Sequence, residues 1–274
     1  MANARRELAA HGLAPSRARG QNFLRRPELA ARIVERLGVS PGDAALEIGP
    51  GLGQLTRALA AVARRTLALE VDRGLVALLA REGELPASVE LRLGDALAVD
   101  LGALAAELGP PVVLVGNLPY SIAGRLLGEV LLPATPFRLI GCMLQRELAD
   151  RILAAPGSAD YGTLSVYARL WFRGERLLEL SREEFSPRPK VRSTFLALGP
   201  RPTPPGVTDV AVLRRLVRAA FGQRRKQLRR ALEREFPQAA DALASLGIDP
   251  KRRGETLDEA EFAALANALA VAGS

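Results

Sequence analysis

The sequence Val112-Val113-Leu114-Val115-Gly116-Asn117-Leu118-Pro119-Tyr120 joins a short apolar run to an amide, a proline and an aromatic residue. Its first four residues predict a buried strand. Asn117 offers a carbonyl acceptor and an amide donor, Pro119 fixes the backbone and lacks an N–H, and Tyr120 supplies a flat ring for stacking. The stretch therefore suits a planar ligand with an amino group, such as the edge of adenine. A plain strand-to-helix turn fits these residues equally well.

The same order of an apolar strand, a polar or glycine residue and an amphipathic helix recurs on both sides of this stretch. The expected strands are Ala44–Ile48, Thr66–Val71, Val89–Leu93, Val112–Val115 and Leu139–Leu144, with a helix near Glu147–Leu153 after the last. This alternation predicts an α/β fold, in which helices cover both faces of a parallel sheet. In such sheets ligands bind at the carboxyl ends of the strands.

Four polar residues stand at successive strand ends, namely Glu47, Glu70, Asp95 and Asn117. Helix caps and solvated turns would account for one or two of them, but less readily for all four. Because the carboxyl ends of parallel strands share one edge of the sheet, these side chains are predicted to form a row there.

Composition excludes several classes of protein. The 274 residues include 38 basic and 30 acidic ones, a formal charge of +8 that is weak evidence for binding a polyanion. With one cysteine (Cys142) and one histidine (His11), no disulfide framework and no metal site are expected. Ser-His-Asp and Cys-His chemistry are excluded unless the segment around residue 11 folds into a cleft. No apolar run reaches the ~20 residues of a spanning helix, and no secretory signal is evident, so a cytoplasmic protein is expected.

Three regions follow from composition along the chain. Residues 1–20 read as a mobile basic arm with Arg5, Arg6, Arg17 and Arg19. Residues 21–200 form the predicted main domain, in which Leu164–Trp171 fits helix or strand, and Leu177–Leu180 and Thr194–Leu198 fit strands. The proline-rich run 199–206 reads as a stiff linker. Residues 207–274 read as helical throughout.

The motif Glu47-Ile48-Gly49-Pro50-Gly51-Leu52-Gly53 follows the first strand of the alternation. A dinucleotide fingerprint requires G-x-G-x-x-G, whose third glycine falls here on Gln54. The pattern instead resembles the first motif of S-adenosylmethionine-dependent methyltransferases. Glu70 is then placed to accept hydrogen bonds from both ribose hydroxyls, a role that acidic residues also have in dinucleotide folds. Asp95 could accept from the adenine amino group, with Ala96 beside the ring.

Taken together, several stretches resemble the ribosomal RNA adenine N6,N6-dimethyltransferase family. They are Asn117-Leu118-Pro119-Tyr120, Gln21-Asn22-Phe23-Leu24, Glu47–Gly53, Leu144-Gln145-Arg146-Glu147, Tyr161–Val166, Phe185–Ser193 and Phe221-Gly222-Gln223-Arg224-Arg225-Lys226. The similarity is strongest to the bacterial small-subunit (16S) members. It implies a Rossmann-like methyltransferase fold with a seven-stranded sheet and a small C-terminal helical domain, and S-adenosylmethionine as methyl donor without a metal. It also implies a monomer that dimethylates two adjacent adenines in a hairpin near the 3′ end of 16S rRNA and contributes to small-subunit biogenesis.

The resemblance also implies roles for individual residues. Contacts to S-adenosylmethionine fall to Asn22, Leu24, Gly49, Gly51, Glu70, Asp95, Ala96 and Asn117. The Asn117 side chain and the Leu118 carbonyl would accept both hydrogens of the adenine amine, Pro119 would fix the turn, and Tyr120 and Phe185 would sandwich the base. Holding the amine in this way favours a pyramidal nitrogen whose lone pair points at the methyl group. Two departures from the family, Ser121 and Arg230, concern the details of RNA contact.

The segment between Arg214 and Arg234 carries nine basic residues and one acid, Glu233. A merely solvated helix face is one interpretation. Next to an RNA-modifying site, contact with phosphates is the stronger one, because such contacts position RNA without reading its sequence. The predicted RNA-binding residues are Arg224, Arg225, Lys226 and Arg229.

Three alternatives stay open. A large-subunit (23S) rRNA adenine N6-methyltransferase of the antibiotic-resistance type shares most of these motifs. A nicotinamide-dependent oxidoreductase shares the fold, although Gln54 replaces its third glycine. A non-catalytic ribosome-assembly or RNA-binding protein could keep the fold without the reaction.

Overall fold

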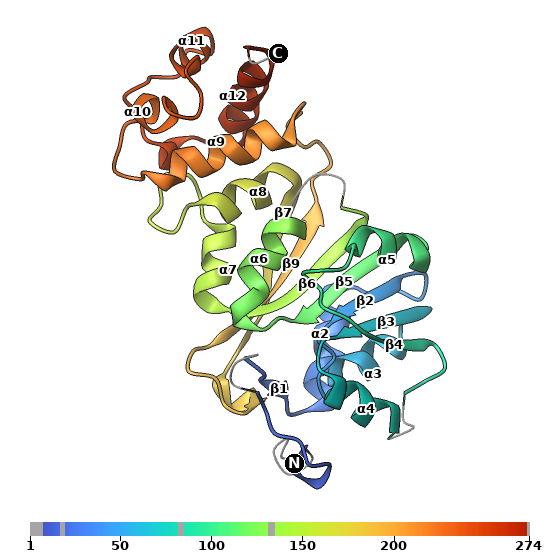
Figure 1. The fold of residues 1–274 in the computed structure, drawn as a ribbon. Helices are drawn as coiled ribbons and strands as arrows, with labels where there is room; N and C mark the ends of the chain where they lie inside the picture. The colour runs from blue at the N-terminus through green and yellow to red at the C-terminus, as the bar shows by residue number, and fades with distance from the viewer. Residues whose placement is uncertain (1–7, 17–19, 82–84, 131–134, 273–274) are drawn as a thin grey trace. The chain divides into compact units, whose positions relative to one another are not determined.

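The computed structural model describes residues 8–16, 20–81, 85–130 and 135–272, with residues 120, 121 and 272 described by their backbone alone. These residues form two compact units (Figure 1). The first consists of the chain up to Leu127, Thr135–Ala149 and Glu175–Gly199. The second consists of 128–130, Asp150–Gly174 and the chain from Pro200 onward. The segment 150–174, expected within the main domain, thus packs with the helical unit, while the division into functional domains at 21–200 and 207–274 stays a prediction.

The main sheet has seven strands. They are β2 (Ala44–Ile48), β3 (Arg65–Glu70), β4 (Val89–Leu93), β5 (Val112–Asn117), β6 (Phe137–Gln145), β7 (Phe172–Leu180) and β9 (Ser193–Pro200). Their spatial order is β4-β3-β2-β5-β6-β9-β7. The first five pair in parallel, and β9 runs antiparallel to β6. The predicted α/β fold with a seven-stranded sheet is confirmed.

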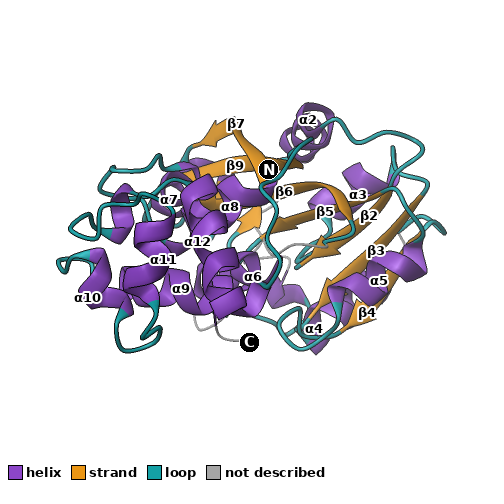
Figure 2. Ribbon diagram, turned by 90° about the horizontal axis from the view of Figure 1, so that it is seen from above, coloured by secondary structure: helices purple, strands orange, loops and turns teal. Residues whose placement is uncertain are grey.

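Helices connect the parallel strands and flank the sheet. They are α2 (Pro27–Leu37), α3 (Gln54–Ala60), α4 (Arg73–Arg81), α5 (Leu101–Leu108), α6 (Tyr120–Val130) and α7 (Arg146–Leu153). Helix α2 begins with Pro27 and ends before Gly38, whose φ of 71° is the left-handed conformation that suits a helix C-cap. Its buried Ile33 and Val34 pack with α3 in one apolar cluster on the sheet. Figure 2 shows α3 and α5 next to strands β2, β3, β4 and β5.

The chain reverses its direction of sheet growth next to β2. Strands β3 and β4 are added on one side of β2, and β5 then pairs on the other side, with Ile48 opposite Gly116. Such a switch point leaves a crevice outside the carboxyl ends of the two strands. The ends of β2 and β5 are where Glu47 and Asn117 stand, so the topology places the predicted site at this crevice.

Gly116 allows β5 to pass closely by β2. A Cβ atom at this position would lie 2.8 Å from the Ile48 carbonyl oxygen and 2.8 Å from Leu118 Cδ2. Leu118 could move aside, but the Ile48 oxygen belongs to the backbone of the neighbouring strand. Glycine is therefore required here by space.

We predict that Gly116→Ala lowers the free energy of unfolding by about 1–3 kcal/mol, the usual cost of overpacking. The matched control is Gly124→Ala in α6, where a Cβ would meet nothing within 4 Å. Because glycine in a helix costs roughly 0.5–1 kcal/mol relative to alanine, the control should be neutral or stabilising. Urea denaturation of both variants measures the difference, and equal stability would contradict the steric explanation.

Residues 8–13, which belong to the stretch 1–20 predicted as a mobile arm, are packed rather than free. Leu8 is 1% exposed and belongs to an apolar cluster with Phe23, Leu52, Leu75 and Leu78. Leu13 packs against this cluster, and its backbone N–H donates to the Leu8 carbonyl. The prediction of mobility is therefore wrong for this stretch, because its leucines outweigh its polar composition. The arginines Arg5, Arg6, Arg17 and Arg19 lie outside the described residues.

A two-stranded sheet joins residues that are far apart in the chain. Strand β1 (Phe23–Leu24) pairs antiparallel with β8 (Phe185–Ser186), so that Leu24 lies opposite Phe185. A 3₁₀ turn at Arg182–Glu184 precedes β8. Neither strand is predictable from the sequence, since two residues carry no periodic signal.

The second unit is helical. It contains α8 (Thr163–Trp171), α9 (Val210–Gly222), α10 (Leu228–Leu232), α11 (Ala239–Ser245), a 3₁₀ turn at Gly254–Thr256 and α12 (Glu259–Ala272). Tyr161 is fully buried, contacts the Phe221 ring edge-on and donates its hydroxyl to the Leu257 carbonyl at 2.9 Å. Phe221 stacks in turn on Phe262. The motifs beginning at Tyr161 and Phe221 therefore share one aromatic core.

Among the described residues, no helix is both long and apolar enough to cross a bilayer.

Candidate active site

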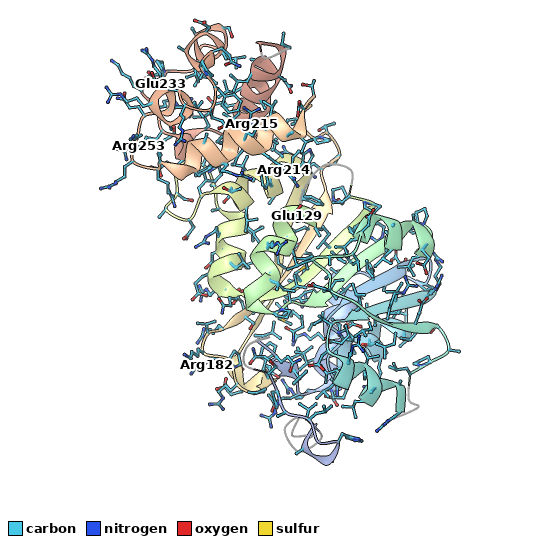
Figure 3. All side chains as sticks on the ribbon, in the orientation of Figure 1. Glu129, Arg182, Arg214, Arg215, Glu233 and Arg253 are labelled. Atoms are coloured by element: carbon cyan, nitrogen blue, oxygen red, sulfur yellow. The ribbon has the colours of Figure 1, made fainter. Side chains whose placement is uncertain are left out.

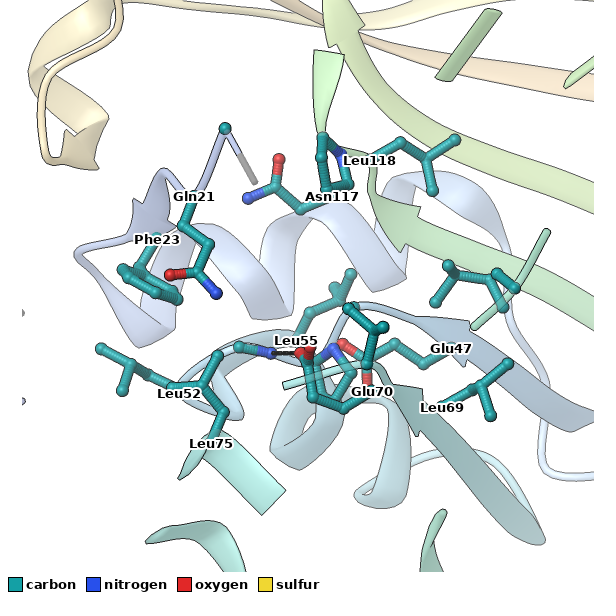
Figure 4. A pocket seen from close by; sticks show the side chains of 18 of the residues that line it. Gln21, Phe23, Glu47, Leu52, Leu55, Leu69, Glu70, Leu75, Asn117 and Leu118 are labelled. Carbon is teal, nitrogen blue, oxygen red and sulfur yellow. Dashed lines mark hydrogen bonds between the residues drawn. The ribbon is translucent and has the colours of Figure 1, made fainter. Parts of the chain in front are cut away.

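An open cavity of about 940 Å³, a volume that includes its mouth, lies at the carboxyl ends of β2, β3 and β5 (Figure 4). Its wall includes every residue predicted to contact the methyl donor. These are Asn22, Leu24, Gly49, Gly51, Glu70, Asp95, Ala96 and Asn117, joined by Leu118 and Pro119. The structure thus brings the predicted row together, whereas binding by these residues stays a prediction.

The glycine-rich turn forms the floor of the cavity. Gly49, Gly51 and Gly53 all have positive φ, at 71°, 59° and 75°. A Cβ on Gly51 would also lie 2.8 Å from the Phe23 ring. The alternation of glycines in this motif therefore has a backbone cause, because every second residue adopts a left-handed conformation.

Glu70 is 5% exposed and holds two backbone segments of the cavity wall. Its Oε2 accepts from the Gly51 N–H at 3.2 Å, and its Oε1 accepts from the Asp72 N–H at 3.0 Å. Burial raises the pKa of Glu70, and these backbone hydrogen bonds act against that rise. The carboxyl group thus ties the glycine turn to the start of α4.

Asn117 ends β5 with its side chain amide oriented by the N-terminal segment. Its Nδ2 donates to the Asn22 carbonyl at 2.7 Å. Because this contact requires the donor end of the amide, Oδ1 faces away from Asn22 and is available as an acceptor. An acceptor at this place suits the amino group of a base.

Asp95 and Ala96 follow β4 at the side of the cavity. Asp95 is exposed, and one carboxylate oxygen accepts from the Leu97 N–H at 2.9 Å. Ala96 is 8% exposed and lines the wall. An exposed acceptor beside a small apolar residue fits the edge and face of a planar ring.

The two residues predicted to sandwich a base are not both placed for that task. Tyr120 begins α6, but its side chain lies outside the described residues. Phe185 is 3% exposed and packs in the core with Leu24 and Phe195. It is absent from the described cavity lining, because the pairing of β8 with β1 turns its ring inward. The structure thus buries the Phe185 ring, and its role as a stacking face stays a prediction.

Glu47 is a buried carboxyl group in the cavity wall. It is 1% exposed, and its Oε2 has no hydrogen-bond partner among the described residues. Burial is the main cause that raises the pKa of Glu47 to about 8; the nearby Thr56 hydroxyl lowers the pKa and the Glu70 charge raises it. Figure 4 shows Glu47 and Glu70 close to one another.

Gln21 is a cavity residue to which the sequence analysis gave no role of its own. Its Oε1 accepts from the Ser16 N–H at 2.8 Å, and its Nε2 donates to Asp72 Oδ2 at 3.2 Å. It thereby fastens the N-terminal segment to α4. The only signal in the sequence was its place in the stretch Gln21–Leu24.

The predicted RNA-binding residues lie in the helical unit: Arg224, Arg225 and Lys226 in the turn between α9 and α10, and Arg229 in α10. Arg224 is held internally, since its guanidinium donates to the Ala159 and Tyr161 carbonyls at 3.0 and 3.1 Å. Arg225, Lys226 and Arg229 are exposed, and within the described chain their side chains have no hydrogen bond or ion pair. These three are free to meet an anion.

Other basic residues of this segment are neutralised within the unit. Arg214 pairs with Glu129 at 3.1 Å (Figure 3). Arg215 pairs with Glu235 at 2.6 Å and also lies over the Phe236 ring. The charge available to a ligand is therefore smaller than the count of nine basic residues suggests.

Within the described ranges, no group of three histidine, cysteine, aspartate or glutamate side chains is arranged to hold a metal ion.

Comparison with known proteins gives consistent matches. The family model described as ribosomal RNA adenine dimethylase matches residues 16–271. A ribosomal RNA small subunit methyltransferase A of Dinoroseobacter shibae is 45% identical over 271 residues, covering 97% of this chain and 96% of the relative. The protein of the same name from Geobacillus thermodenitrificans is 39% identical, covering 96% and 93%.

Solved structures agree in fold. A dimethyladenosine transferase from Plasmodium falciparum superimposes with a TM-score of 0.74 at 23% identity, covering 89% of this chain and 95% of that one. The 23S rRNA methyltransferase ErmE superimposes with a TM-score of 0.63 at 28% identity, covering 91% and 100%.

Proposed function

Because the chain belongs to the ribosomal RNA adenine dimethylase family, we propose that it transfers methyl groups from S-adenosylmethionine to N6 of adenines in small-subunit rRNA. The observation that carries this proposal is the convergence of Asn22, Glu70, Asp95 and Asn117 on one cavity at the switch point of the sheet. These residues come from four separate segments of the chain, and they offer acceptors where a nucleoside and an amine would require them.

The cavity fits the methyl donor by its chemistry. Glu70 supplies a buried carboxyl group for the ribose hydroxyls, and Asp95 and Ala96 supply an acceptor and an apolar face for the adenine. Glycine is required at position 51 of the floor, since a Cβ there would lie 2.8 Å from the Phe23 ring. When bound, the donor supplies an electrophilic methyl group on a positively charged sulfur.

The protein residues would act mainly by positioning. The Asn117 Oδ1 and the Leu118 carbonyl would accept the two hydrogens of the adenine amine, so that the nitrogen lone pair becomes available to the methyl group. Correct positioning of two reacting groups is worth up to ~7–11 kcal/mol of a barrier in favourable cases. Such a reaction needs no strong general base, which agrees with a chain whose one histidine is His11.

The substrate is inferred to be small-subunit rather than large-subunit rRNA. Curated relatives named for the small subunit are 39–45% identical over nearly the whole chain, against 28% for the 23S enzyme. On the family resemblance we further infer two adjacent adenines in a hairpin near the 3′ end of 16S rRNA, each methylated twice, and a contribution to subunit biogenesis. A cytoplasmic monomer is expected with this substrate.

One experiment tests the proposal directly. The protein is incubated with labelled S-adenosylmethionine and small subunits that lack the modification, and the rRNA is digested to nucleosides. N6,N6-dimethyladenosine from small-subunit rRNA is the expected product, and large subunits serve as the control substrate. Label in 23S rRNA alone would favour the antibiotic-resistance type. Binding to the subunit without any labelled nucleoside would favour a non-catalytic assembly factor.

We also propose that Arg225, Lys226 and Arg229 contact rRNA phosphates. The three side chains are exposed and have no hydrogen-bond or ion-pair partner within the described chain. Arg224, in contrast, donates to a backbone carbonyl. Lysine and arginine contacts of this kind release counterions, so affinity falls as salt rises.

We predict that the double variant Arg225→Glu/Lys226→Glu binds small subunits more weakly at low salt. The slope of log affinity against log salt should fall by about 2, roughly one for each lost phosphate contact. The matched control reverses two exposed arginines of α2, Arg32→Glu/Arg36→Glu, which changes the net charge equally. If both double variants shift the salt slope alike, net charge rather than a local grip explains the binding.

A further inference from the structure

Glu47 has no role in the reaction proposed above, although burying its carboxyl group costs free energy. A buried polar atom normally has a hydrogen-bond partner, and an isolated buried carboxylate is strongly disfavoured. Glu47 lines the cavity with 1% exposure, and its Oε2 has no partner among the described residues. A bound ligand is therefore the expected source of an opposite charge for the Glu47 carboxylate.

The rest of the cavity adds negative charge and none of the opposite sign. Glu47, Glu70 and Asp95 line it, and its described lining contains no lysine, arginine or histidine. Asp72 stands next to it at the start of α4. The nearby Arg57 of α3 directs its guanidinium to the Leu52 carbonyl at 2.9 Å. Such a cavity favours a ligand with a positive charge.

The protonation state of Glu47 follows from these surroundings. Because burial raises its pKa to about 8, with a further contribution from Glu70, Glu47 is mostly protonated at neutral pH. A cation bound nearby favours the charged carboxylate and lowers that pKa. Arrival of a cation should therefore release a proton from this site.

We propose that Glu47 is the specificity residue by which the cavity prefers the sulfonium methyl donor to the neutral sulfide that remains after transfer. This inference rests on the proposed function. When the methyl group moves from sulfur to the adenine nitrogen, the nitrogen gives up one proton to solvent and the sulfur becomes neutral. Glu47 then regains a proton from solvent, and its attraction to the sulfonium charge is gone. In this proposal Glu47 neither accepts the substrate proton nor contacts the adenine amine. Its role is to favour release of the sulfide, because the positive charge that it attracts is lost on transfer.

The expected effect is large enough to measure. Two unit charges about 4–8 Å apart at an effective dielectric constant near 20 attract strongly enough to change an affinity by about tenfold or more. The preference for S-adenosylmethionine over S-adenosylhomocysteine should accordingly fall by about tenfold in Glu47→Gln. Sinefungin, which carries a protonated amine where the donor carries sulfonium, should behave like the donor.

The test is isothermal titration calorimetry of the whole protein with these three ligands, in two buffers of different ionisation enthalpy. In the wild type, donor binding near neutral pH should release more protons than sulfide binding, and the excess should vanish in Glu47→Gln. Donor affinity should rise as pH rises toward and through about 8, the free-state pKa of Glu47, and then level off. Titration of the ligands' own amino groups persists in the variant and is removed by the comparison.

Glu90→Gln, on β4 and outside the described cavity lining, is the matched control and should behave as the wild type. Should Glu47→Gln fail to show cooperative thermal unfolding, the difference in proton release in the wild type decides alone. Equal proton release with donor and sulfide, or an unchanged preference in Glu47→Gln, would overturn the inference and leave the proposed function standing. A wild type that binds neither ligand would overturn both.

Discussion

Replacing Asn117 by alanine is expected to reduce the rate of methyl transfer to small-subunit rRNA by about 100- to 1,000-fold, the range seen when one positioned polar group of an active site is removed. The variant loses Oδ1, the acceptor that faces away from Asn22. Donor binding should suffer much less. The lost bond from Nδ2 to the Asn22 carbonyl is worth roughly 0.5–1.5 kcal/mol, which corresponds to at most about tenfold in affinity.

Single-turnover rates with labelled donor and calorimetry of donor binding separate these two effects. Asn267→Ala is the control, because it removes an asparagine amide from the helical unit, where that side chain meets Thr208 and Gly206. A variant at Asn117 that methylates at the wild-type rate would refute its assignment as the amine acceptor. A variant that loses donor binding and rate in parallel would assign the residue to the donor instead.

Glu70→Ala is expected to abolish donor binding at ordinary concentrations and to weaken the fold as well. Two hydrogen bonds to a charged group, at about 1.5–3 kcal/mol each, correspond to a loss of affinity of about 100-fold or more. In addition, the N–H groups of Gly51 and Asp72 lose their acceptor. Leaving such groups unsatisfied costs about 1–3 kcal/mol of stability.

Calorimetry and denaturant unfolding distinguish the two losses, and Glu70→Gln helps because its amide keeps one acceptor. Glu90→Ala on the adjacent strand is the control, since its partners are Arg65 and Arg92. Saturating donor should stabilise the wild type against heat and leave Glu70→Ala unaffected. Donor affinity within about threefold of the wild type would remove Glu70 from the ribose site.

The local sequence predicts well where strands such as β2 lie along the chain, but it predicts poorly which strands are neighbours in the sheet. Strand β2 was expected at Ala44–Ile48 and lies there, because an apolar run between Asp43 and Gly49 leaves no other boundary. The order of strands in the sheet is a different matter. Nothing within β5 says that it pairs with β2 rather than β4, since that choice depends on contacts between distant segments.

The pairing of β1 with β8 shows the limit most clearly. Each strand has two residues, too few to display alternation. Their pairing has a direct effect on the site, because it draws Phe185 into the core opposite Leu24. Family resemblance indicates the residue type but not the direction in which the Phe185 ring points.

The residue type likewise predicts the charge of a side chain, but not whether that side chain is free to bind a ligand. Arg224 and Arg225 are adjacent, exposed and chemically identical, yet Arg224 is held by two backbone carbonyls, whereas the Arg225 side chain has no hydrogen bond or ion pair within the described chain. Glu47 is the converse case. The row of strand-end residues included it, but the lack of a partner for its Oε2 depends on packing from α3 and the glycine turn. The roles of all these residues stay predictions until the variants are measured.

The packing of Leu8 and Leu13 has a practical meaning for anyone who produces this protein. Both leucines lie behind Phe23 and Leu75, two side chains whose other surfaces border the cavity. A shortened recombinant form that starts after these leucines, or a bulky fusion tag that displaces them, would remove the side chains that pack behind the wall of the cavity. Preparations that differ only in their first thirteen residues should therefore not be treated as interchangeable in assays of donor affinity.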